Sequence, residues 1–142
     1  MTEVKYPELL DVHEAMAHLR AVVAEFGKDH VYTKPDHSGV CVYVHGSAEE
    51  LVPGCIVAQV LHRHGVPMNV LSQYEGLGAL QLAGPKSLTG RGVKPLLTEA
   101  AGTVLGNAQY VQDGLKPWGA ALANAEDVYH LNGYAGSKEG QR

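Results

Sequence analysis

Two cysteines and two histidines have the residue types and the spacing to bind a metal. Cys41 and His45 lie four positions apart in a segment predicted to be a strand, so they share one strand face. Cys55 and His62 lie seven positions apart in a segment predicted to be a helix, so they share one helix face. If the two pairs converge, they supply a tetrahedral Cys2His2 zinc site. The spacing matches no common zinc module, and the alternative is that both cysteines are core residues.

A pair of short helices over residues 56–74 could instead read DNA. The turn at 65–67 separates them, and the residues available to contact bases or phosphates are Arg63, Asn69 and Gln73. Recognition helices use such polar and basic side chains. The net charge of −4 and the lack of a basic block disfavour attraction to phosphates. Nucleic acid therefore stays an alternative partner only.

Catalytic motifs are missing from the sequence. The eight histidines are scattered, and neither G-x-S-x-G nor H-E-x-x-H occurs. A histidine that acts as a base in nucleophilic catalysis needs a nucleophile in a recognisable local setting. The sequence thus predicts a protein that is not an enzyme, with no catalytic residues and no cofactor apart from zinc.

Length and composition indicate one domain that folds on its own. The chain has 142 residues, of which 45% are hydrophobic and only 18% are charged. That content is enough for a core and leaves a surface that favours self-association or a protein partner. We find neither an apolar run of membrane-spanning length nor a signal-peptide pattern, so we expect a cytoplasmic protein that does not enter a membrane.

The elements that would position these residues follow from the apolar periodicity. Apolar residues at steps of three and four predict helices over 8–26, 53–64 and 95–131, the last as a pair broken near Gly114. β-branched and aromatic residues at 30–33 and 40–45 predict a β-hairpin packed on the buried central helix. We therefore expect a mainly helical α+β fold, with a single domain over 1–132 and a flexible tail over 133–142.

Two stretches resemble a family of small uncharacterised proteins carried by actinobacterial phages and their hosts. The first is the segment 55–67, preceded by Cys41-Val-Tyr-Val-His45. The second is the segment 108–114, followed by Pro117-Trp-Gly-Ala-Ala-Leu122. The resemblance covers roughly residues 30–127 and implies a cytoplasmic setting in an infected or lysogenic cell. It carries over no catalytic residues.

The second stretch of this resemblance contains a polar cluster beside the only tryptophan. If Trp118 is more than a core anchor, then Gln109, Gln112 and Asp113 form a patch for a partner. The alternative is a helical corner in which the indole covers the core. The leading hypothesis is a non-enzymatic, phage-type accessory protein that binds a host or phage protein. The DNA-associated regulator and the zinc protein are the alternatives.

Overall fold

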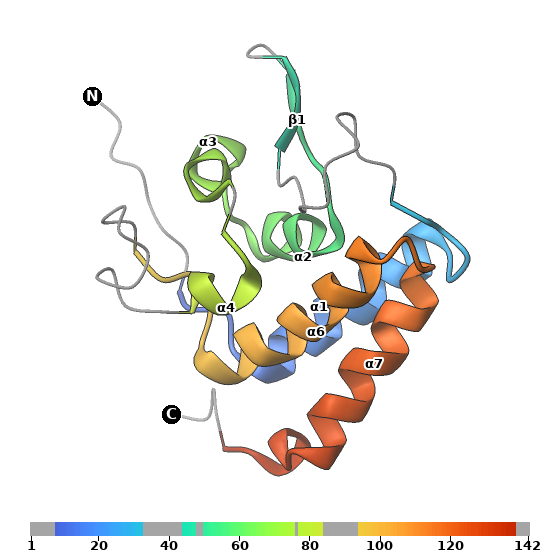
Figure 1. Ribbon diagram of the computed structural model, residues 1–142. Helices are drawn as coiled ribbons and strands as arrows, with labels where there is room; N and C mark the ends of the chain where they lie inside the picture. Colours follow the sequence, from blue (N-terminus) through green and yellow to red (C-terminus); the bar gives the residue numbers. More distant parts are fainter. Residues whose placement is uncertain (1–7, 33–43, 48–49, 76, 84–93, 139–142) are drawn as a thin grey trace.

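Helices make up most of the part of the chain that the structure describes. The computed structural model describes residues 8–32, 44–47, 50–75, 77–83 and 94–138. Along these ranges the elements are α1 (Val12–Phe26), β1 (Val44–Ser47), β2 (Glu50–Pro53), α2 (Ile56–His64), α3 (Met68–Leu71), the 3-10 turn η1 (Ser72–Tyr74), α4 (Ala79–Leu82), α6 (Glu99–Asp113), α7 (Trp118–Leu131) and the 3-10 turn η2 (Tyr134–Gly136) (Figure 1). None of the helices in these ranges is both long and apolar enough to cross a membrane.

The expected α+β class is wrong, because the described core is made by helices. The hairpin expected between 30–33 and 40–45 is not formed by the residues described there. Residues 30–32 are not a strand, and 33–43 lie outside the described residues. A short ribbon forms later in the chain instead, where β1 pairs antiparallel with β2 and Val44 lies opposite Pro53. β-branched residues favour an extended chain, but two strands cannot build a core without helices.

The first helix follows its apolar stripe closely. Six of its residues are buried, namely Val12, Ala15, Met16, Leu19, Val22 and Val23. The carboxylate of Asp11 accepts a hydrogen bond from the Glu14 amide at 2.9 Å, which makes Asp11 the N-cap. The helix starts later than the expected residue 8, because Leu10 is extended and its main chain bonds to Leu96 and Thr98.

The central and C-terminal helices confirm the helical part of the prediction. Five residues of α2 are buried, and the helix ends at Gly65, whose φ of 109° suits glycine. It begins at Ile56 rather than Pro53, because Pro53 is the last residue of β2. After it, α6 contacts α1, α2, α4 and α7, so α6 is the element that these four helices share (Figure 1).

The segment after α7 contacts the start of the fold. His13 on α1 lies 2.7 Å from the Tyr129 hydroxyl through Nδ1 and 2.9 Å from the Ser137 carbonyl through Nε2. Ser137, within the expected tail, therefore contacts α1. Residues 139–142 lie outside the described residues.

An ion pair joins α1 to α7 at the surface. Arg20 donates two hydrogen bonds to the Glu126 carboxylate, from Nη2 at 2.6 Å and from Nε at 3.2 Å. The hydrogen bond from Arg20 lowers the pKa of Glu126, while partial burial opposes this change. Both side chains keep contact with water, so we expect the pair to contribute modestly to stability.

We predict that Glu126→Gln removes a part of the stability that depends on pH. Since the folded-state pKa of Glu126 is lowered, the pair stabilises the protein above the ordinary carboxyl value of 4.5, and this contribution is lost as the pH falls through the lowered value. Urea unfolding at pH 7 should show a loss of about 0.2–1 kcal/mol in the variant. The difference should vanish in strong acid and shrink in high salt. Equal differences at pH 7 and in strong acid would contradict the assignment.

Candidate protein-interaction surface

Of the four residues of the expected zinc site, only Cys55 and His62 have side chains that the structure describes. Cys55 is buried and disulfide-bonded, so in this form it has no thiolate to offer a metal. Cys41 lies outside the described residues, and His45 lies in β1, where side chains are not described. His62 is exposed in the last turn of α2.

The three residues proposed to contact DNA do not lie along a recognition helix. Arg63 ends α2 and its Nη1 lies 3.4 Å from a carboxylate oxygen of Glu25. Asn69 and Gln73 are exposed, but they lie on a single α-helical turn and on the 3-10 turn that follows it. A recognition helix presents several side chains along a groove, which one turn does not achieve.

Two glutamines expected at a partner surface are instead buried and cap other helices. The Oε1 atom of Gln112 accepts a hydrogen bond from the amide of Ile56, the first residue of α2, at 2.7 Å. The Oε1 atom of Gln109 accepts from the amide of Ala79, the first residue of α4, at 3.0 Å. Neither helix has a side-chain cap from its own N-cap residue. The glutamines satisfy buried amides that would otherwise lack a partner.

Trp118 is a core residue, as the alternative interpretation had it. Its side chain is 1% exposed and makes edge contacts with the rings of His30 and Phe26, whose centroids lie 4.5 and 5.1 Å away. The main-chain amide of Trp118 donates to the His30 carbonyl at 2.7 Å. The indole therefore anchors the start of α7 and is not available to a partner.

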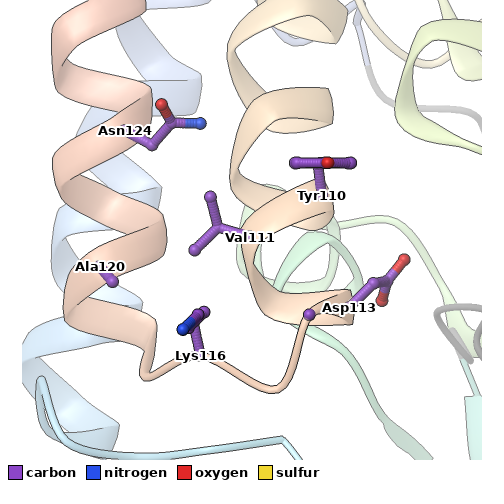
Figure 2. Close-up of a pocket in the computed structure, with 7 residues that line it drawn as sticks. Tyr110, Val111, Asp113, Lys116, Ala120 and Asn124 are labelled. Atoms are coloured by element: carbon purple, nitrogen blue, oxygen red, sulfur yellow. The ribbon is translucent and has the colours of Figure 1, made fainter.

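A hollow opens where α6 turns into α7. Its volume is about 780 Å³, and its lining is mostly apolar. Figure 2 shows Val111, Lys116 and Asn124 directed into the space between the two helices. The other lining residues are Tyr110, Asp113, Gly114 and Ala120. Asp113 is the one residue of the expected partner patch that lies here.

Large apolar side chains stand exposed around this hollow. Tyr110 is 81% exposed and also borders a second hollow of about 310 Å³, which lies on the side of Leu80 and Asn107. Leu115 is 67% exposed and has a φ of 63°, a left-handed conformation that leucine rarely adopts. We call this surface the Tyr110 face, defined as Tyr110, Asp113, Leu115, Lys116 and Asn124.

The sequence contains a signal for this face that lies outside the motifs described above. The buried stripe of α6 includes Val104, Leu105 and Ala108, and Tyr110 lies off that stripe. A large aromatic residue at a position that the helical period assigns to solvent indicates a surface with a use outside the core.

Comparisons of the chain with protein-family models, with curated proteins and with solved structures found no match. The resemblance to phage proteins therefore stays a prediction.

We predict that Gln112→Met destabilises the protein although it preserves the size and apolar stem of the side chain. The Ile56 amide would be left buried without its acceptor, which costs about 1–3 kcal/mol. Urea unfolding followed by circular dichroism measures the loss. Ala123→Met places the same side chain at an exposed position of α7 and should change stability by less than about 0.5 kcal/mol. Similar stabilities for the two variants would show that the cap is unimportant.

Proposed function

We propose that this chain is a protein-binding protein without catalysis of its own, and that it binds through the Tyr110 face. The observation that carries the proposal is Tyr110 itself, an aromatic ring that stands in solvent between two hollows. Tyrosine is enriched among the residues that dominate interface energies, because it buries a large area with few rotatable bonds. An exposed ring beside a mostly apolar hollow is suited to such a contact.

The backbone of Leu115 supports the same face. A leucine in the left-handed region costs about 1–2 kcal/mol relative to its usual conformations. Burial of the Leu115 side chain within the monomer does not offset this cost, because the side chain is largely exposed to water. The conformation lets the Leu115 amide donate to the Gln112 carbonyl at 2.9 Å and so helps to end α6, but it leaves the leucine side chain in solvent. Residues in strained conformations are concentrated at functional surfaces.

The occupant that this face fits is a second copy of the chain. Asp113 and Lys116 line the same hollow and carry opposite charges. In a two-fold symmetric contact the same surface meets itself, so Asp113 of each copy can pair with Lys116 of the other. The ring of Tyr110 and the hollow beside it are self-complementary in the same way, because the ring of each copy can enter the hollow of the other.

The sequence also predicts a cellular location and a class for this protein. We keep the cytoplasm of an infected or lysogenic cell as the proposed location and phage accessory proteins as the proposed class. In that location the disulfide of Cys55 would have to resist reduction, because cytosolic thiols are normally kept reduced. A host or phage protein on the Tyr110 face is the other occupant that the experiments below distinguish.

We predict a monomer–dimer equilibrium that depends on charge pairing across the face. Sedimentation equilibrium should show dimers of the wild type, and Tyr110→Ala should raise the dissociation constant by about tenfold or more. Asp113→Lys and Lys116→Asp should each weaken the dimer, and the double variant should recover it, because the pair is restored with its signs exchanged.

The control for these variants is Leu131→Ala, which removes an exposed side chain at the far end of α7 and should leave the dimer intact. A wild type that stays monomeric up to millimolar concentration overturns the second copy as occupant. A double variant as weak as its two parents would show that the two charges do not meet.

We further predict that Leu115→Asn separates stability from association. Asparagine tolerates the left-handed conformation, so the free energy of unfolding should stay unchanged or rise by up to about 1 kcal/mol. The dimer should weaken several-fold, because the exposed apolar side chain is lost from the face. Thermal unfolding and sedimentation equilibrium on the same samples measure the two effects, and an unchanged dimer would exclude Leu115 from the contact.

A further inference from the structure

Three side chains with metal-binding chemistry meet at the crossing of α1 and α2. Glu14 and His18 lie four positions apart on α1, which places them one above the other on the same face. His64 is the last residue of α2. One carboxylate oxygen and one ring nitrogen from each histidine all lie within 4.8 Å of one another.

The hydrogen bond of His64 fixes which of its nitrogens faces the cluster. Its Nε2 atom lies 2.8 Å from the main-chain carbonyl oxygen of Glu8, and a carbonyl only accepts, so Nε2 carries the proton. The Nδ1 atom lies 3.6 Å from a carboxylate oxygen of Glu14. In the neutral ring, Nδ1 has a lone pair, so two electron-rich atoms face each other and a cation between them would be favourable.

The surroundings suit a cation bound at the edge of the protein. The side chain of His64 is 12% exposed, whereas Glu14 is half exposed at 54%. His18 is partly buried, and its ring centroid lies 5.9 Å from that of His64. The neighbouring guanidinium of Arg63 points to Glu25, which offsets part of its charge. The side of the cluster at Glu14 therefore remains open to water.

We propose that Glu14, His18 and His64 bind a divalent transition-metal ion, with Zn²⁺ as the best match. Two imidazoles and one carboxylate are a ligand set that Zn²⁺ uses, with water in the fourth position. The carbonyl of Glu8 holds the remaining ring nitrogen of His64, as the second shell of a metal site commonly does. This site shares no residue with Cys41, His45, Cys55 and His62, and it does not depend on the Tyr110 face.

The metal would join parts of the fold that are distant in sequence. It would link α1 to the end of α2, whose last residue already holds the segment before α1 through Glu8. An ion that binds only the folded chain stabilises it by mass action. We therefore expect Zn²⁺ well above its dissociation constant to raise the Tm by several degrees.

The test uses the full chain without an added histidine tag. Isothermal titration with Zn²⁺ and the visible absorption of Co²⁺ should both give one ion per chain. His18→Ala, His64→Ala and Glu14→Gln should each weaken binding by about tenfold or more. Glu14→Gln changes an exposed side chain, so its effect is readable even if a histidine variant fails to fold.

His62→Ala is the matched control, because His62 is an exposed histidine in the same last turn of α2 but outside the cluster. It should keep the affinity and the Co²⁺ spectrum of the wild type. No saturable binding of Zn²⁺ below about millimolar concentration would overturn the proposal, as would an equal loss in His62→Ala and His64→Ala. Loss only in the three cluster variants would support it.

Discussion

The structure depends on the capping of two helices by a third. The backbone amides at the starts of α2 and α4 donate hydrogen bonds to the side-chain oxygens of Gln112 and Gln109, respectively. These two glutamines lie three positions apart on one face of α6. A helix start that is buried without an acceptor is costly, and neither Cys55 nor Gly78 supplies one from its side chain. α2 and α4 therefore gain part of their stability from α6, although α6 follows both in the chain.

This arrangement also decides which residues of α6 face solvent. With Gln109 and Gln112 directed inward, the neighbouring Tyr110 is directed outward, and Asp113 comes to line the hollow beside α7. The interior and the proposed contact surface are thus two sides of the same helix. A substitution that rotates or shortens α6 would disturb helix capping and the Tyr110 face together.

The periodicity of the sequence was sufficient to locate the long helices, because each buries one stripe. It was insufficient for the class of fold, since the part of the expected hairpin that the structure describes, residues 44 and 45, belongs only to a short ribbon with 50–53. The glutamines were misassigned because polarity along one segment does not reveal that a distant amide needs an acceptor. Glu14 and His18 are visible as a pair at helical spacing, but their meeting with His64 depends on how α1 crosses α2, which a single sequence does not specify.

The position of Trp118 makes its intrinsic fluorescence a local probe of the fold. It is the only tryptophan among 142 residues, and its ring lies buried against Phe26 and His30. All indole fluorescence therefore comes from one place, where the end of α1 meets the start of α7. Opening of that corner changes the Trp118 emission directly. Binding at the exposed Tyr110 or at the crossing of α1 and α2 changes the emission only indirectly, through the side chains packed between these places and the indole.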